Sequence, residues 1–190
     1  MSVKRSGGRP ANEEASAALK AAALRLVRET GYEKVSIAAI IAEAGVARQT
    51  LYNRWDTKAD LILEAIFEAT NSYAAEPPLD SAQDYRAQLE DFLIKVFEHL
   101  KLDGATIRSL IASSQQDAKF HASFQAKFVL PREQMMTLML RRAQDHGALS
   151  PARNVEVLST MIHGAFWYRL LNRGVLDAAF AKEIVAETFA

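Results

Sequence analysis

Cysteine is absent from the 190 residues of this chain. Disulfide bonds, thiolate metal sites and a cysteine nucleophile are therefore excluded. Long apolar runs are missing as well: no stretch is long enough to span a bilayer, and the first residues do not form a signal peptide. No two-residue alternation of apolar side chains marks a strand. We expect an all-helical cytoplasmic protein with no membrane partner.

The motifs of common enzymes are also missing. No glycine-rich phosphate loop, no His-Glu metal motif and no nucleophile elbow occurs. His99, His121 and His146 lack the spacing of metal ligands. Glu64 and Glu68 lie four residues apart without a histidine to complete a metal site, so we expect them on a solvated helix face. We expect no enzyme, no metal and no cofactor.

Charge is distributed unevenly although its sum is zero. Residues 1–60 hold ten Lys and Arg against seven Asp and Glu, whereas residues 61–190 hold thirteen against sixteen. A cationic N-terminal part favours contact with a polyanion there and not elsewhere.

Apolar residues recur at helical spacing along the whole chain. Gly31 is expected to end the first helix, and the two prolines between Glu76 and Asp80 predict a connector. A kink is expected at Pro131, inside a long helix. The predicted helices are 13–30, 36–44, 47–55, 58–73, 81–101, 105–117, 118–146, 151–171 and 177–189.

The segment Ser36–Trp55 contains two short predicted helices with a turn at Gly45. Such a pair with a short glycine turn is typical of DNA-reading helix-turn-helix units. Leu51 and Trp55 are expected to face the core. The opposite, polar face can hydrogen-bond to base edges and phosphates, and it comprises Arg48, Gln49, Thr50, Tyr52 and Asn53.

Residues 44–55, followed by Lys58, Ala59, Asp60 and Leu61, resemble the helix-turn-helix signature of the TetR family of transcription regulators. The resemblance is dense over residues 13–65, and Trp55 stands where the family usually carries Phe. It implies phosphate contacts from Ser36, Tyr52 and Lys58. It further implies base contacts from among Arg48, Gln49, Thr50 and Asn53.

An N-terminal arm precedes the first predicted helix. Its cations are Lys4, Arg5 and Arg9, with Gly7 and Gly8 between Arg5 and Arg9, a composition that can follow a narrow minor groove. The alternative is a solvated terminus without contacts to DNA.

The C-terminal half is rich in Phe and Met. Most of these side chains are expected in the core, but Met is also common at permissive ligand surfaces, and the resemblance implies an effector cavity in this half. Its candidate lining is Phe92, Phe124, Phe128, Met135, Met139 and Trp167. His163 is a possible hydrogen-bonding partner in the cavity, although an interface role is favoured.

An apolar stripe near the end of the chain predicts a homodimer. The resemblance implies that the helices 153–171 and 177–189 of two copies pack as a four-helix bundle. The domains are then a flexible basic arm (1–12), a DNA-binding domain with its connecting helix (13–75) and an effector-binding and dimerisation domain (76–190). The stripe is Leu158, Met161, Ile162, Ala165 and Phe166.

The sequence therefore predicts a DNA-binding regulator, foremost a repressor released from a palindromic operator by a small-molecule effector. Two alternatives stay open at this point. One is a constitutive or co-activating DNA-binding protein without an effector. The other is a helical adaptor that binds proteins and not DNA.

Overall fold

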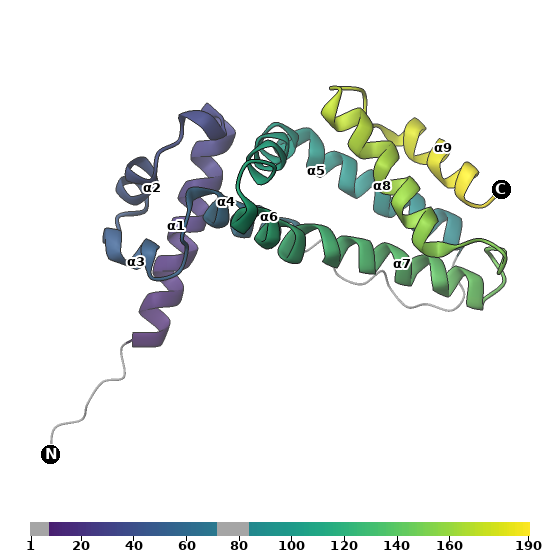
Figure 1. Cartoon of the computed structure of the whole chain (residues 1–190), viewed down its shortest axis with the longest axis horizontal. Helices are drawn as coiled ribbons and strands as arrows, with labels where there is room; N and C mark the ends of the chain where they lie inside the picture. Colours follow the sequence, from purple (N-terminus) through teal and green to yellow (C-terminus); the bar gives the residue numbers. More distant parts are fainter. Residues whose placement is uncertain (1–7, 72–83) are drawn as a thin grey trace, which may run out of the picture.

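The structure is a computed structural model that describes residues 8–71 and 84–190 (Figure 1). Within these two ranges the chain is helical and contains no strand, which confirms the all-α class. No helix in the described part of the chain is long and apolar enough to cross a membrane. The elements are α1 (Gly8–Thr30), η1 (Tyr32–Lys34), α2 (Ile37–Ala44), α3 (Arg48–Tyr52), α4 (Lys58–Asn71), α5 (Tyr85–Ser114), α6 (Ala118–Phe124), η2 (Gln125–Val129), α7 (Leu130–Asp145), α8 (Val155–Leu171) and α9 (Ala178–Thr188).

The helices form two groups (Figure 1). In the N-terminal group, α2 and α3 lie against α1, and α4 leads towards the second group. In the C-terminal group, α5 packs against α8 and α9, and α7 packs against α8. Helix α4 also contacts α5 and α6, and α1 contacts α5, so both α1 and α4 join the two groups.

Helix α1 begins at Gly8, earlier than the sequence predicted. Residues 8–12 of the predicted arm therefore belong to the helix. Pro10 is compatible with this position because the first helical turn leaves its backbone donors unsatisfied in any case. Lys4 and Arg5 lie outside the described residues, so their predicted minor-groove contact has no structural counterpart here.

The helix-turn-helix follows the predicted boundaries in α2 but not in α3. Ser36 caps α2, with its Oγ accepting a hydrogen bond of 3.1 Å from the Ala39 amide. Gly45 then takes the left-handed conformation, with φ of 65°, which glycine adopts without a Cβ clash. Helix α3 stops at Tyr52, so the prediction that it reaches Trp55 is wrong. Trp55 is nevertheless buried beneath it.

A single helix, α5, replaces the two helices predicted over 81–101 and 105–117. The sequence predicted that a helix ends near Gly104, whereas α5 continues through this residue. A Cβ at Gly104 would lie 2.8 Å from Cδ1 of Leu170. Glycine therefore serves close packing of α5 against α8 here, rather than a break.

Two further boundaries were predicted from proline. The helix predicted over 118–146 is interrupted by the π-helical turn η2, which ends at Val129, and Pro131 lies in the first turn of α7. Helix α8, however, does not begin at Pro151. It begins at Val155, because the side chain of Asn154 accepts from the Val157 amide and caps the helix.

Candidate DNA-reading surface and internal cavity

The polar face predicted on α3 is present at the surface. Arg48, Gln49, Tyr52 and Asn53 are exposed, and Thr50 is half-buried. Nε2 of Gln49 donates to Oδ1 of Asn53 at 2.8 Å, while the guanidinium of Arg48 lies 5.4 Å from the centre of the Tyr52 ring. Gln49 pairs with Asn53 and Arg48 with Tyr52 on an exposed surface, where such side chains can hydrogen-bond to base edges and phosphates.

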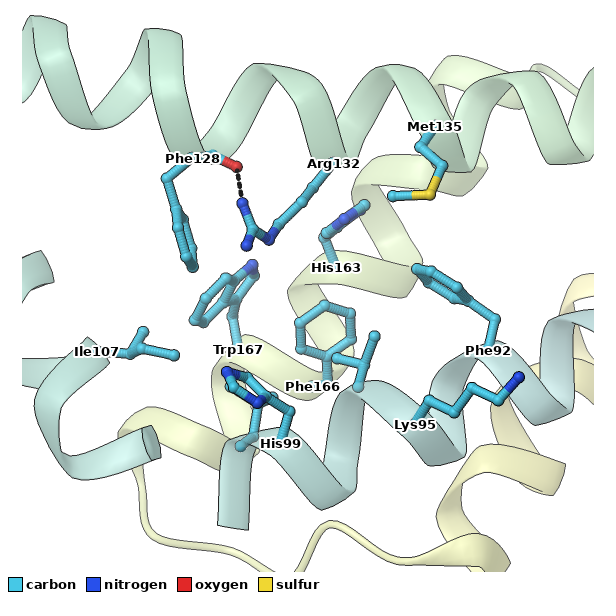
Figure 2. A pocket seen from close by; sticks show the side chains of 12 residues that line it. Phe92, Lys95, His99, Ile107, Phe128, Arg132, Met135, His163, Phe166 and Trp167 are labelled. Carbon is cyan, nitrogen blue, oxygen red and sulfur yellow. Dashed lines mark hydrogen bonds between the residues drawn. The ribbon is translucent and has the colours of Figure 1, made fainter. Parts of the chain in front are cut away.

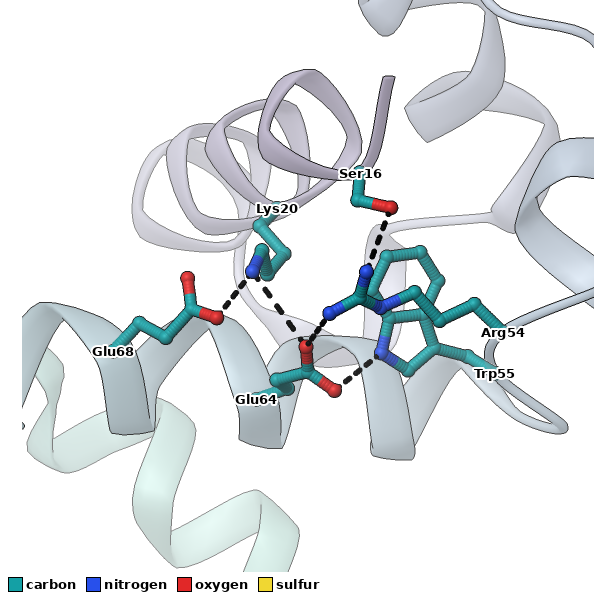
Figure 3. Close-up of polar contacts among 6 residues, drawn as sticks. All are labelled: Ser16, Lys20, Arg54, Trp55, Glu64 and Glu68. Atoms are coloured by element: carbon teal, nitrogen blue, oxygen red, sulfur yellow. Dashed lines mark hydrogen bonds and ion pairs between the residues drawn. The ribbon is translucent and has the colours of Figure 1, made fainter. Parts of the chain in front are cut away.

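An ion-pair network fixes the end of α3 (Figure 3). The Glu64 carboxylate on α4 accepts 2.9 Å from Nε1 of Trp55 and 3.1 Å from Nη2 of Arg54. Arg54 also donates 3.1 Å to Oγ of Ser16 on α1. These contacts join α1, α4 and the residues that follow α3.

Lys20 of α1 extends the same network. Its ammonium lies 3.5 Å from Oε1 of Glu64 and also pairs with Glu68. Burial raises the pKa of Glu64, but the hydrogen bonds from Trp55 and Arg54 and the nearby cations outweigh it and hold this pKa below its ordinary value. The expectation of a solvated carboxylate face is therefore wrong for Glu64, which is a structural anchor.

Lys58 and Ser36 are also engaged within the chain. The ammonium of Lys58 donates to the carbonyls of Tyr32 at 2.8 Å and Val35 at 2.9 Å. Burial lowers the pKa of Lys58. These contacts hold η1 against the start of α4. The phosphate contacts that the resemblance implies for Lys58 and Ser36 stay predictions.

A small cavity lies between α5, α7 and α8 (Figure 2), with a volume of about 60 Å³. Four of the six side chains predicted to line an effector cavity stand in its wall: Phe92, Phe128, Met135 and Trp167. The other two are elsewhere in the core. Phe124 stacks on Phe128, with ring centroids 5.0 Å apart, and Met139 is buried.

A cation of the cavity wall, Arg132, was not among the residues predicted from the sequence. Arg132 lies over the ring of Phe128, with its guanidinium carbon 3.7 Å from the centroid, and donates 2.8 Å to the Phe128 carbonyl. Burial lowers the pKa of Arg132 to about 10. His163 stands in the same wall rather than at an outer interface, and its Nδ1 lies 2.8 Å from the Ser159 carbonyl.

Another wall residue leads out of the cavity to the helix-turn-helix group. Nε2 of His99 lies 3.2 Å from Oδ2 of Asp103, one turn further along α5. Asp103 is completely buried. Its two oxygens accept hydrogen bonds of 2.7 Å each from Nε and Nη2 of Arg28 on α1. A continuous series of polar contacts thus connects the cavity with α1.

The predicted dimer stripe on α8 divides into an inner and an outer part. Leu158, Ile162 and Phe166 are buried in the single chain, and Leu158 and Ile162 lie at the base of an open cleft between α8 and α9. Met161, by contrast, is 62 % exposed and Ala165 is half-buried. The exposed apolar side chains of α8 follow one another at spacings of four, seven and three residues. They are Val157, Met161, Tyr168 and Leu171.

Comparison with known proteins identifies both groups of helices. The family model of the bacterial regulatory proteins of the tetR family matches residues 19–65, and that of the tetracyclin repressor-like C-terminal domain matches residues 79–188. The HTH-type transcriptional regulator YdeS of Bacillus subtilis is 28 % identical over 187 residues, covering 96 % of this chain and 91 % of its own. The DNA-binding transcriptional repressor TetR of Mycobacteroides abscessus is 25 % identical over 178 residues, covering 91 % and 90 %.

Solved structures agree with these relatives. The TetR family transcription regulator SCO0332 superposes with a TM-score of 0.77 at 28 % identity, covering 92 % of this chain and 96 % of its own. FadR from Bacillus subtilis in complex with stearoyl-CoA has a TM-score of 0.73 at 15 % identity, covering 92 % and 97 %, and so shares the fold. Together with the exposed polar face of α3, these matches show that the chain belongs to the TetR family and is a DNA-binding transcriptional regulator.

Proposed function

We propose that this regulator is a homodimeric repressor that binds a palindromic operator and is released when a small molecule occupies the cavity. The observation that carries the proposal is the connection from the cavity wall through His99 and Asp103 to Arg28 on α1. A ligand that displaces His99 changes the surroundings of the buried carboxylate on which α1 is anchored.

A second contact supports coupling through α4. The guanidinium of Arg132 lies 5.6 Å from the ring of Phe67, and α4 carries Phe67 at the junction of the two helix groups. The cavity wall therefore contacts both helices that hold the helix-turn-helix in place. A ligand releases DNA only if it binds the DNA-incompetent arrangement more tightly than the competent one.

On the DNA side, the polar face of α3 is the surface that enters the major groove. Two copies of α3 related by a two-fold axis require two matching half-sites in register with the helical repeat. Phosphate contacts from Ser36, Tyr52 and Lys58 and base contacts from among Arg48, Gln49, Thr50 and Asn53 complete this proposal. The cavity side chains Phe92, Phe128, Met135 and Trp167 form the apolar part of the effector site.

Release of a labelled operator tests the proposal. In a Trp55→Phe variant, Trp167 is the remaining tryptophan and reports occupation of the cavity by fluorescence. A chemically broad library is screened for compounds that change this fluorescence, and operator affinity is then measured with and without them. We expect affinity to fall by about 5- to 150-fold, the usual range of such coupling.

The same experiment separates the two alternatives. Compounds that occupy the cavity and leave operator affinity unchanged would favour a constitutive DNA-binding protein. Absence of any duplex binding that responds to salt would favour a helical protein adaptor, because phosphate contacts make DNA affinity depend steeply on salt.

A further inference from the structure

The polar side chains in the cavity wall all carry N–H groups, which can donate hydrogen bonds to a ligand. The twelve lining residues include Lys95, His99, Arg132, His163 and Trp167, but no carboxylate, amide or hydroxyl side chain. Lys, Arg and Trp only donate hydrogen bonds, whereas His99 and His163, whose pKa values burial lowers, each donate with one ring nitrogen in the neutral form. A ligand that satisfies this wall presents an acceptor to it.

Arg132 is the cation best placed to meet such an acceptor. Its guanidinium projects from α7 towards Trp167 in the middle of the view in Figure 2, whereas the ammonium of Lys95 points away from the centre. One of its N–H groups is used by the Phe128 carbonyl at 2.8 Å. Burial disfavours the charged form of Arg132. An anion in the cavity would offset that cost, because an opposite charge favours the charged form.

Among the residues that the structure describes, no carboxylate lines the cavity. Asp103 is beyond His99 and is already held by two hydrogen bonds from Arg28. Burial lowers the pKa of His163, against the opposing effects of the Ser159 carbonyl and Glu133, and Glu133 lines a neighbouring cleft and not the cavity. Burial also lowers the pKa of His99. The charged side chains of the cavity wall are therefore the cations Lys95 and Arg132, beside imidazole, indole and apolar groups.

The neighbouring cleft indicates how large the ligand is. It has a volume of about 320 Å³ and shares Phe128, Arg132, His163 and Trp167 with the cavity of about 60 Å³. The cavity alone holds only a few heavy atoms. Arg132 lines both spaces, so a ligand bound to its guanidinium in the cavity lies next to the cleft.

We propose that this site takes a monoanionic carboxylate with a compact apolar body, its carboxylate on the guanidinium of Arg132 and its body among the aromatic side chains. A planar carboxylate matches the fork of guanidinium donors, and such charge-assisted hydrogen bonds are about twice as strong as neutral ones. This inference rests on the function proposed above, since it names the chemical class of the effector.

Calorimetry on the full chain with three matched probes tests the ligand class: 4-phenylbutanoate, 4-phenylbutanamide and 4-phenylbutylamine. We expect the acid to bind at least about tenfold more tightly than the amide, as expected for a hydrogen bond to a charged group, and the amine not to bind. Arg132→Met, which keeps an apolar stem, should remove the preference for the acid. Arg132→Lys should retain part of it, and thermal unfolding shows whether each variant is folded.

Lys101→Met is the matched control, because it removes a cation of α5 that pairs with Glu98 at the surface and does not line the cavity. It should leave the preference for the acid unchanged. Equal binding of acid and amide to the native chain, an acid that fails to bind at millimolar concentration, or an acid preference that survives Arg132→Met would overturn the inference.

An operator-release assay on the same probes keeps this inference separate from the proposed function. Acid binding that depends on Arg132 but leaves the operator bound would refute release by ligand while the ligand class stands. Release by the amide and not by the acid would refute the ligand class while the proposed function stands.

Discussion

The carboxylate of Asp103 is completely buried, and Arg28 reaches it from α1 with two hydrogen bonds of 2.7 Å. Leaving one member of such a pair buried and unpaired costs about 3–5 kcal/mol. Asp103→Asn is the milder way to break the pair, because it leaves a neutral amide inside, and Arg28 is partly exposed and can reach water.

We expect Asp103→Asn to weaken the coupling between ligand and operator more than it weakens either binding step alone. The reason is that the variant keeps the cavity and α3 but loosens their connection through α1. The measurement is the ratio of operator affinities with and without a compound that releases the native protein. Asp56→Asn is the control, since it breaks the exposed pair with Lys119, and such surface pairs contribute little to stability. An unchanged ratio in Asp103→Asn would contradict this connection.

The residues of α3 allow a second prediction at this scale. Asn53→Ala should cost about 1–3 kcal/mol on the preferred operator and little on unrelated duplexes, because a base contact carries the sequence information. Tyr52→Phe should weaken binding to both kinds of duplex equally, since a phosphate contact carries none. Neither variant removes a charge, so the dependence of affinity on salt should stay the same. Equal loss of specificity in both variants would show that the two roles are wrongly assigned.

Single residues also explain why the DNA-reading face was predictable from the sequence whereas the charged part of the cavity was not predicted. The face of α3 is exposed and local, so periodicity alone orients it. Arg132 lies on one helical stripe with Phe128, Met135, Met136 and Met139. A cation within an apolar stripe indicates a buried charge, so the burial of Arg132 was predictable from this spacing. Which cations are engaged inside the chain, as Lys58 is, depends on carbonyls of η1 that only the folded chain brings close.

At the scale of elements, α4 is held to α1 and to the end of α3 by one carboxylate. Glu64 has a pKa below its ordinary value of 4.5 in the folded chain. A carboxyl group with a lowered folded pKa contributes stability above its unfolded pKa and loses it as the pH falls through the folded pKa.

We therefore expect the free energy of unfolding of the native chain to fall more steeply below about pH 4.5 than that of Glu64→Gln, which has no such carboxylate to protonate. Urea unfolding followed by circular dichroism at several pH values measures this difference. Glu68→Gln is the matched control, because Glu68 pairs with the same Lys20 from an exposed position and should follow the native chain closely. Parallel pH profiles of the native chain and Glu64→Gln would contradict the role given to this network.

The boundaries of elements were predictable where a local cap or turn determines them. Gly31, Gly45 and the capped starts of α2 and α9 are of this kind. Elsewhere tertiary packing decides. Gly104 has low intrinsic helix propensity, yet α5 continues through it because Leu170 of α8 fills the space where a side chain would be.

At the scale of the whole molecule, α8 presents an apolar stripe that the single chain leaves uncovered. Met161 and Tyr168 are 62 % and 71 % exposed. An amphipathic helix with an exposed apolar stripe of this kind favours a partner surface.

Met161→Asp should give monomers that bind a palindromic operator far more weakly, because two half-sites then have to be bound independently. Sedimentation at micromolar concentration measures the oligomeric state. Ile162→Asp is unsuitable for this purpose, since Ile162 is buried in the protomer and its replacement disrupts the core. Leu102→Asp, at an equally exposed position on α5, is the control and should remain dimeric. A dimer that survives Met161→Asp would place the interface elsewhere.

Selection from random DNA duplexes tests the central claim, that paired copies of α3 read an operator, most directly. The full chain should enrich palindromes whose half-sites lie one helical turn, about 10–10.5 base pairs, or a multiple of it apart. The variant Asn53→Ala should enrich the same spacing with relaxed base choice within each half-site. Enrichment of no common sequence, or of single half-sites without symmetry, would contradict the account.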